Sequence, residues 1–369
     1  MRNRSKVLHI VPAPFGPDGI FGGAERYALE LAKSMARRLP TRLVSFGMQS
    51  RRTIHEEGLE EIVLGKAWSV RGQRTNPYHS GIFRHIWWAD VVHCHQNHTF
   101  GAEVAAMFSR LTRKKVYASD LGGGGWGLNG YIKTDRLFTR HLHISEYSRN
   151  LAGHTHIDGA AVIYGGVDTS RFFPDRSVPK EPLVVFVGRV MPHKGVDNLI
   201  RALPYGLTLE VIGRPYNIEY QAMLTKLAVG KAVHFRSGCD DNEVIQAYCR
   251  AICVALPSLY RDCYGNETRI PELLGQTLLE GMACGVAGLC TQVASLPEVV
   301  EAGVSGYVVP PNDPDALGER LRTLRDNPNL VAQMGQGARQ RVLTRFTWDA
   351  VVDRCFAAYG VAGVPLSAS

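Results

Sequence analysis

Short apolar runs alternate with helix-prone stretches along both halves of this 369-residue chain. Runs of strand length include Val7–Val11 and Val91–Cys94 in the first half, and Leu183–Val187 and Ile252–Leu256 in the second. A continuous apolar run of this length is typical of a strand buried on both faces, and a helix between two such strands makes a parallel pair. The alternation therefore predicts an α/β fold of βαβ units, with ligands at the carboxyl ends of the strands.

Further segments extend this alternation along the chain. The other predicted strands are Arg42–Phe46, Val116–Ala118, Thr208–Ile212, Val233–Phe235 and Ala287–Thr291. The predicted helices are Ala24–Arg38, Gly101–Leu111, Gly195–Leu203, Asn242–Cys249 and Gln276–Met282. Since single hydrophobic cores stop growing at about 250–300 residues, we expect two doubly wound, Rossmann-like domains facing each other across a cleft. The proline-rich segment Pro174–Pro182 is the predicted linker.

The composition is that of a folded globular protein, with 45% hydrophobic and 21% charged residues. The apolar runs are too short to span a bilayer. Pro12 interrupts the first of them, so we expect a buried strand there and not a signal sequence. The eight cysteines lie mostly in apolar segments, without the Cys-x-x-Cys spacing of zinc sites. We expect them to be buried free thiols in a reducing, cytoplasmic compartment.

Positive charge is concentrated in the first half. Residues 1–165 contain 22 Lys/Arg and 13 Asp/Glu, a net of +9, and residues 166–369 contain 20 and 21, a net of −1, which together give the overall +8. Such an imbalance favours an anionic partner for the first half: a phospholipid surface, a lipid-phosphate acceptor or nucleic acid. No interleaving of basic and aromatic residues supports nucleic acid. The alternative is that scattered arginines only solvate the surface.

The segment PELLGQTLLEGMACG, residues 271–285, places two carboxylates on either side of a glycine. If a helix begins near Gln276, just after Gly275, its free N–H groups and positive dipole end form an anion site. Glu272 would then lie in the loop before the helix, where it can accept hydrogen bonds from sugar hydroxyls. Glu280 would lie in the first turns and could accept both hydroxyls of a ribose. The alternative is a loop with one solvated Glu and a helix with another.

The segment VFVGRVMPHKG, residues 185–195, runs from a predicted strand into Gly188 and then presents Arg189 and Lys194 before a helix. A diphosphate leaving group gains negative charge during glycosyl cleavage. A planar guanidinium and a compact ammonium are suited to stabilising that charge. The alternative is a surface loop that happens to carry two basic residues.

Together, these two segments resemble the retaining family 4 glycosyltransferases, which have the GT-B fold. Shorter segments that resemble motifs of that family follow in order along nearly the whole chain: FGGAER (21–26), DVVHCH (90–95), HISEYS (143–148), VIYGGVDTSRF (162–172), PEVV (297–300), GYVVP (306–310) and FTW (346–348). The resemblance implies an acceptor-binding Rossmann-like domain over residues 1–165, completed by a crossing helix at 347–369. It implies a nucleotide-sugar donor-binding domain over residues 166–346.

The resemblance also implies roles for the residues that match the motifs. Arg189 and Lys194 would hold the donor diphosphate, and Glu272 would contact the transferred sugar. The residues implied to bind the rest of the donor are Gly22, Gly23, Gly188, Arg236, Ser237, Gly275, Gln276, Thr277 and Glu280. Among these, the two glycines of the first domain would approach the diphosphate, Glu280 would bind the ribose, and residues 236–237 would lie near the nucleobase.

One stretch departs from the family. Many relatives carry a histidine on the acceptor side where this chain has Ser119, Asp120 and Leu121. Asp120 is therefore a candidate for positioning the acceptor hydroxyl or the donor sugar. Four glycines follow, at 122–125, and then Trp126, which would suit close backbone approach to a ligand and an aromatic platform for a sugar ring. The alternative is a flexible loop with a packed tryptophan.

Several other side chains have two interpretations. His93, His95 and His98 could face a ligand, although histidines at strand ends are more often hydrogen-bonded structural residues, and a His-x-His pair alone does not make a zinc site. We therefore predict no metal site. Trp87 and Trp88 could anchor the chain at a membrane interface or pack a helix on the sheet.

These observations predict a retaining, metal-independent glycosyltransferase without a cofactor. The donor would be a nucleotide diphosphate sugar, UDP- or GDP-linked, and the acceptor a carbohydrate, lipid-linked or other hydroxyl in the synthesis of surface polysaccharide or glycolipid. We expect a cytoplasmic protein, with possible contact between its basic domain and the anionic inner face of the membrane. The alternatives are a non-catalytic nucleotide-sugar-binding protein of the same fold, or an epimerase with that fold.

Overall fold

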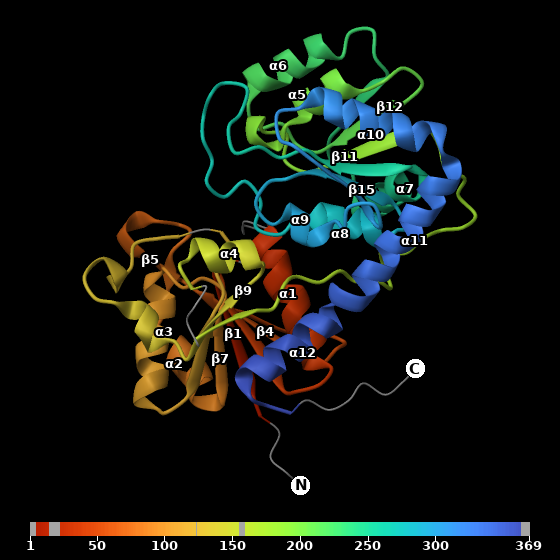
Figure 1. Cartoon of the computed structure of the whole chain (residues 1–369). Coiled ribbons are helices and arrows are strands. Elements are labelled where there is room, and N and C mark those ends of the chain that lie inside the picture. The colour runs from red at the N-terminus through yellow and green to blue at the C-terminus, as the bar shows by residue number, and fades with distance from the viewer. Residues whose placement is uncertain (1–4, 15–22, 123, 155–158, 363–369) are drawn as a thin grey trace. The chain divides into compact units, whose positions relative to one another are not determined.

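The computed structural model describes residues 5–14, 23–122, 124–154 and 159–362. The chain divides into two compact units, one formed by residues 1–166 with 348–369 and the other by residues 167–347. Each unit contains a mainly parallel sheet with helices on both of its faces (Figure 1). This layering follows from the apolar strands, which must be covered on both sides to be removed from water.

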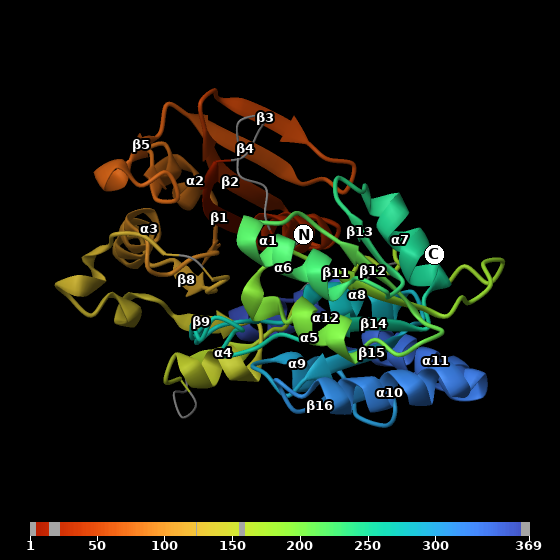
Figure 2. The ribbon, with the colours of Figure 1, turned by 90° about the horizontal axis from the view of Figure 1, so that it is seen from above.

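The first unit has an eight-stranded sheet in the order β10-β9-β8-β7-β1-β2-β4-β3. Its strands are β1 (Val7–Pro14), β2 (Thr41–Gly47), β3 (Arg51–Ile54), β4 (Glu60–Gly65), β7 (Val91–Cys94), β8 (Lys115–Ala118), β9 (Arg140–His143) and β10 (Ala160–Val162). All neighbours are parallel except β3 and β4, which form an antiparallel pair at one edge (Figure 2). A separate two-stranded sheet joins β5 (Trp68–Ser69) to β6 (Pro77–Tyr78).

Helices cover the two faces of this sheet because alternate strand residues point to opposite sides. The helices of this unit are α1 (Gly23–Ala36), α2 (Ile82–Trp88), α3 (Phe100–Leu111), α4 (Glu146–Leu151) and α12 (Trp348–Tyr359). Leu8 of β1 packs in one core cluster with Ile86 of α2 and Ala105 of α3. On the opposite face, Val63 of β4 packs with Ala28 of α1. Helix α12 packs beside α1 (Figure 1).

The second unit has a six-stranded, fully parallel sheet in the order β13-β12-β11-β14-β15-β16. Its strands are β11 (Leu183–Val187), β12 (Thr208–Ile212), β13 (Val233–Arg236), β14 (Cys253–Leu256), β15 (Ala287–Thr291) and β16 (Gly306–Val309). Its helices are α5 (Val196–Ala202), α6 (Ile218–Leu227), α7 (Asp241–Arg250), α8 (Gln276–Ala283), α9 (Leu296–Val299), α10 (Pro314–Asp326) and α11 (Pro328–Arg345). Helices α5, α6 and α10 lie on one face, and α7, α8 and α11 on the other (Figure 1). The predicted strands and helices of this half are confirmed.

The expected linker at Pro174–Pro182 is wrong, because this segment lies inside the second unit. The Glu181 amide donates to the Arg250 carbonyl over 2.8 Å, and the two side chains form an ion pair at 2.9 Å. The Cys249 thiol donates to the Phe173 carbonyl over 3.6 Å just before the segment. Its proline-rich composition therefore reflects a stretch of irregular chain that runs along the unit.

Candidate active site

The topology of the second sheet places a switch point between β11 and β14. The chain moves outward from β11 to β12 and β13, and then returns to the other side of β11 to form β14, β15 and β16. In open parallel sheets, the loops after two such strands run in opposite directions, and ligands bind at their carboxyl ends. The segment with Arg189 and Lys194 follows β11, and the segment with Glu272 lies between β14 and α8. The fold therefore brings the two predicted motifs to one edge of the sheet.

A glycine allows the two loops to approach each other. Gly195 has φ +68° and lies between the short 3₁₀ turn Pro192–Lys194 and helix α5. A Cβ atom at this position would lie 2.0 Å from the carbonyl oxygen of Pro257, which follows β14. Only glycine satisfies both the left-handed backbone and the close contact. The spacing of Lys194 from the opposite loop is set by this contact.

Lys194 and Glu272, which are 78 residues apart in the sequence, form an ion pair. Lys194 is only 8% exposed, and its ammonium also donates to the Pro271 carbonyl over 3.1 Å. The same Glu272 oxygen, Oε1, accepts a hydrogen bond from the Ser258 hydroxyl over 2.7 Å. The cost of removing two charges from water is offset when each has further hydrogen-bond partners, as here. The structure thus brings two of the predicted catalytic residues together and adds Ser258, which the sequence motifs did not single out.

The positive charge at this edge influences a neighbouring imidazole. Burial lowers the pKa of His193, and the charge of Lys194 lowers it further. His193 is therefore neutral near pH 7. Arg189 is exposed, and its charge also lowers the pKa of His193.

Helix α8 begins at Gln276, as predicted, and Gly275 precedes it with φ +89°. Within the described residues, no side chain caps the start of this helix. A helix start of this kind presents backbone N–H groups and the positive end of the helix dipole, which together favour an anion. Glu280 lies within α8 and is 8% exposed. Thr277 contributes its carbonyl to a 3.1 Å hydrogen bond from the Tyr248 hydroxyl.

Arg236 lies apart from this group. Its guanidinium pairs with Glu210 of β12 at 3.1 Å and with Glu243 of α7 at 2.9 Å. Strand β13, which ends at Arg236, is the edge strand two positions from β11. The side chain is therefore held in an ion-pair network, whereas the adjacent Ser237 is exposed.

In the first unit, the structure separates the three possible replacements of the family histidine. Ser119 is buried and hydrogen-bonded to His93 over 2.7 Å, and Leu121 is 8% exposed. Asp120 is partly exposed, and its Oδ1 accepts from the Gln96 amide over 3.2 Å and from the Gly122 N–H over 3.0 Å. Of the three, Asp120 is thus the polar side chain not committed to the core.

The loop that follows Trp126 is packed against a buried carboxylate. A Cβ atom at Gly127 would lie 2.6 Å from Glu103, which is fully buried in α3. Glu103 accepts hydrogen bonds from the Asn129 N–H over 2.9 Å, from the Thr134 hydroxyl over 2.8 Å and from the Leu128 N–H. Glu103 therefore orders the loop, and the sequence analysis missed it because a lone glutamate in a helix carries no motif.

The Trp126 ring, which follows the glycine run, is already in contact with other side chains. It stacks on Phe100 with the ring centres 5.9 Å apart, and the Arg71 guanidinium lies 4.3 Å from its centre. Its backbone N–H donates to Gln73 over 2.7 Å. These contacts favour the packed interpretation of Trp126 over the sugar platform. Of the two glycines implied for the first domain, Gly22 lies outside the described residues, and Gly23 is exposed at the start of α1.

Three buried histidines, His9, His93 and His95, form a cluster whose ring nitrogens lie within 4.8 Å of one another. His9 Nδ1 shares a 2.8 Å hydrogen bond with His95 Nε2, and His93 Nδ1 shares one of 2.8 Å with the Tyr359 hydroxyl. The His95 ring is nearly parallel to the other two, at 18° and 30°. Since a metal ion must lie in the plane of each ligating ring, these stacked, hydrogen-bonded imidazoles fit a polar core better than a metal site. Burial lowers the pKa of His9 to about 3 and lowers the other two as well, so all are neutral at pH 7.

Two aspartates have the Asp-x-Asp spacing that can bind a divalent cation, Asp313 and Asp315. Asp313 accepts a hydrogen bond from the Ala316 N–H over 2.9 Å and caps helix α10. Helix caps commonly use aspartate in this way. This pair therefore marks a helix start.

Residues 168–341 match the family described as glycosyl transferases group 1. This stretch contains the switch point, the Lys194–Glu272 pair and helix α8. The second unit is a glycosyl transferases group 1 domain. The family resemblance drawn from the sequence motifs is confirmed for this part of the chain.

Two curated proteins are similar to about half of this chain. The chain is 33% identical over 224 residues to the GDP-mannose-dependent alpha-(1-6)-phosphatidylinositol monomannoside mannosyltransferase of Mycolicibacterium smegmatis, covering 56% of this chain and 58% of that protein. It is 32% identical over 223 residues to D-inositol 3-phosphate glycosyltransferase 1 of Catenulispora acidiphila, covering 53% and 50%. The chain thus spans about half the length of the curated relatives it matches.

Solved structures extend the likeness to the whole fold. The Anabaena HepE structure in complex with UDP and glucose has a TM-score of 0.70 at 17% identity and covers 96% of this chain and 99% of its own. Sucrose-phosphate synthase from Thermosynechococcus elongatus has a TM-score of 0.71 at 17% identity, covering 97% and 98%. At such identities the likeness shows the fold. The predicted α/β architecture of two Rossmann-like domains, the GT-B fold, is confirmed.

Proposed function

We propose that this protein is a glycosyltransferase that moves a sugar from a nucleoside diphosphate onto an acceptor hydroxyl with retention of configuration. The observation that carries the proposal is the Lys194–Glu272–Ser258 group. It lies at the switch point of a group 1 domain, and Glu272 comes just before helix α8. A buried cation, a carboxylate and a helix start suit a sugar linked to a pyrophosphate. In this proposal the second unit binds the donor and the first unit binds the acceptor.

Lys194 has the hydrogen-bonding capacity for a donor phosphate. An ammonium has three N–H donors, and those of Lys194 have the Pro271 carbonyl and Glu272 as partners in the described residues. The third donor is available to a phosphate oxygen. Arg189, which is exposed on the same loop, would bind a second phosphate oxygen.

Glu272 would recognise the sugar. Its Oε1 accepts from both Lys194 and Ser258, whereas no described residue donates to its Oε2. A carboxylate oxygen held in this way is an acceptor for sugar hydroxyls, which are donors. Glu280 would accept hydrogen bonds from the ribose, and the backbone of residues 275–277 would bind the sugar phosphate. Gly188, residues 236–237 and the glycines at 22–23 would complete the donor site.

The reaction would be a substitution on the face from which the leaving group departs. The carbon–oxygen bond to the diphosphate breaks, the acceptor oxygen bonds to the same carbon, and a departing phosphate oxygen takes the acceptor proton. Lys194, Arg189 and the start of α8 would stabilise the charge that grows on the phosphate, an effect that is large in catalysis. Asp120 would position the acceptor hydroxyl. No step in this scheme needs a metal ion or a cofactor.

The relatives suggest the class of the substrates. One relative is named as GDP-mannose-dependent and another as acting on inositol 3-phosphate, and structures of Anabaena HepE contain UDP. We therefore propose a UDP- or GDP-linked donor and an acceptor in glycolipid or surface polysaccharide synthesis.

We also propose a cytoplasmic protein whose first unit contacts an anionic membrane surface. Residues 1–165 carry a net charge of +9, which attracts an anionic surface. Among the described residues, no helix combines the length and the apolar character that crossing a bilayer requires. The contact that we propose is a peripheral one.

The test is a thermal-shift screen of UDP-, GDP- and ADP-linked sugars, followed by turnover with the sugar that binds. A ligand that binds only the folded state raises the melting temperature. We expect one donor to stabilise the protein and to be hydrolysed slowly to its nucleoside diphosphate. When an acceptor is supplied, NMR should show that the transferred sugar has the same anomeric configuration, axial or equatorial, in the product as in the donor. Stabilisation without any turnover across acceptor panels would favour the non-catalytic alternative, and no stabilisation by any donor would contradict the proposal.

A further inference from the structure

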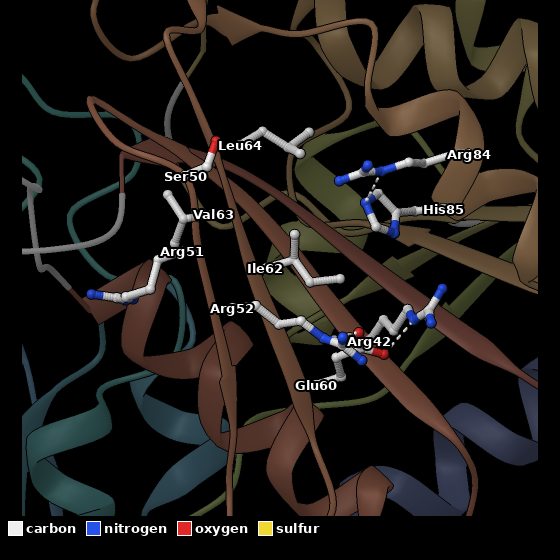
Figure 3. A pocket seen from close by; sticks show the side chains of 10 residues that line it. All are labelled: Arg42, Ser50, Arg51, Arg52, Glu60, Ile62, Val63, Leu64, Arg84 and His85. Carbon is white, nitrogen blue, oxygen red and sulfur yellow. Dashed lines mark hydrogen bonds and ion pairs between the residues drawn. The ribbon is translucent and has the colours of Figure 1, made fainter.

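A groove of about 540 Å³ lies where β2, β3, β4 and α2 meet in the first unit (Figure 3). Ile62 and Leu64 of β4 form apolar parts of its lining. Arg42 of β2, Arg52 of β3 and Arg84 of α2 also line it. Figure 3 shows Ile62 between two groups, one with Arg42 and Arg52 and the other with Arg84. The groove therefore combines an apolar surface with three guanidinium groups.

The charges in the groove do not balance. Glu60 accepts from Arg42 over 2.6 Å and from Arg52 over 2.7 Å, so one carboxylate serves two guanidinium groups. Arg84 donates from Nε to the His85 ring over 3.1 Å and forms no ion pair with any described residue. With His85 neutral, three positive charges face one negative charge at this surface, an excess of two.

His85 adds a buried donor without an acceptor. Its ring lines the groove, and the residue is 5% exposed. Because the Arg84 Nε–H can only donate, His85 Nε2 is the acceptor and the ring proton lies on Nδ1. Among the described residues, Nδ1 has no hydrogen-bond partner. Burial, together with the charges of Arg84 and Arg42, lowers the pKa of His85 to about 4, against the opposing effect of the Glu60 charge.

Two charged residues of the groove lie at the opposite edge of the first sheet from Asp120. Arg42 and Glu60 lie at the amino ends of the parallel strands β2 and β4. Asp120, by contrast, follows the carboxyl end of β8. Arg51 belongs to another cluster, since it points away in Figure 3 and pairs with Glu61 at 2.7 Å. The groove is therefore a surface distinct from the residues proposed for transfer.

We propose that this groove binds a phosphate ester. The doubly charged phosphate would pair with Arg84 and Arg52, and the organic part of the ester would lie on Ile62 and Leu64. Arginine forks match the oxygen geometry of phosphate, and a dianion matches the excess of two positive charges. The ester is either a soluble metabolite or the headgroup of a lipid, which present the same chemistry. The proposal is independent of the reaction assigned to the second unit.

The first experiment measures butyl phosphate binding to the full chain by calorimetry. We expect Arg84→Gln and Arg52→Gln each to weaken binding by about tenfold, because each removes a charged hydrogen-bonding partner. Glu60→Gln should strengthen binding, since it frees Arg42 and Arg52. The control Arg176→Gln removes the same charge from an exposed position in the second unit and should leave binding unchanged. Binding that is absent, or that none of the three groove variants changes, overturns the proposal.

Two further readouts identify the source of the ester and the place of binding. If the ligand is a lipid headgroup, Arg52→Gln and Arg84→Gln should reduce co-sedimentation with phosphatidylcholine vesicles that contain phosphatidic acid. If the ligand is a soluble ester, the two variants should leave co-sedimentation unchanged. Both results support the groove when the calorimetric effects hold. By NMR, the bound anion should raise the pKa of His85 while leaving that of His143 unchanged. An unchanged His85 at saturation would place the ligand elsewhere and overturn the assignment.

Discussion

Lys194 carries a positive charge that is held almost out of water, with the Pro271 carbonyl and Glu272 as partners. We predict that Lys194→Ala lowers turnover by about 100-fold or more, because it removes the cation proposed to stabilise the departing phosphate. It should also lower the melting temperature by a few degrees, since the Glu272 side chain, which is 11% exposed, then loses its cation. The measurements are steady-state kinetics with the donor found in the screen and calorimetry.

The matched control for this residue is Lys226→Ala, at an exposed position at the end of α6. Exposed substitutions of this kind usually change stability by about 0.5 kcal/mol or less, so we expect turnover and melting close to those of the parent. If Lys194→Ala turned over the donor at the parental rate, the proposed catalytic role of Lys194 would be wrong. A drop in melting temperature without a drop in turnover would make the ion pair structural.

At the scale of the element, the turn between β11 and α5 depends on Gly195. Gly195 and Gly230 both have a left-handed backbone, with φ of +68° and +77°. A Cβ atom at Gly195 would lie 2.0 Å from the Pro257 carbonyl oxygen, whereas a Cβ atom at Gly230 would have no neighbour within 4 Å. We predict that Gly230→Ala lowers the free energy of unfolding by about 1–2 kcal/mol, the cost of the left-handed backbone alone. Gly195→Ala should cost clearly more and also weaken donor binding, because the β11 and β14 loops must separate. Denaturant unfolding and the donor thermal shift measure both effects; equal destabilisation by the two variants would contradict the close packing of these loops.

At the scale of the whole molecule, the two units should respond differently to acid. In the first unit, burial lowers the pKa of His9 to about 3 and those of His85 and His143 to about 4. In the unfolded chain these groups titrate near pH 6.5, so below that pH the unfolded state binds protons that the folded state does not. Each such histidine should lower the free energy of unfolding by about 1.4 kcal/mol per pH unit, down to its folded pKa. The first unit should therefore lose stability as the pH falls from 6.5 to 4.

Calorimetry between pH 7 and pH 4.5, with amide exchange to assign the melting transitions, checks this prediction. For the first unit, His143→Gln should reduce the slope of the unfolding free energy against pH by the amount that corresponds to about one proton. His234→Gln, at an exposed position in the second unit, should leave it unchanged. A first-unit transition whose unfolding free energy stays flat over this range would show that the buried histidines do not govern its acid stability.

The strands of the second unit could be predicted more completely than those of the first, and the reason lies in particular residues. Strands such as Leu183–Val187 are continuous apolar runs, which are typical of a buried parallel strand. Strand β9 has the sequence RHLH, and β4 begins with two glutamates, so neither carries that pattern. These segments become strands because a neighbouring strand offers hydrogen bonds, and their polar side chains find partners, such as His143 with His154 at 3.0 Å. Local pattern carries no information about such partners.

The sequence by itself determined the α/β class, the motifs of the second half and the start of α8 after Gly275, because all of these depend on residues close together along the chain. The tertiary structure alone decided which of those residues meet. Lys194 reaches Glu272 across 78 positions because β11 and β14 are neighbours in the sheet. Tyr359 reaches His93 because α12 folds into the first unit. The same holds for Arg42, Arg52 and Arg84, whose common surface exists only once β2, β3 and α2 are assembled. Contacts between distant segments are set by sheet order and packing, which no local pattern encodes.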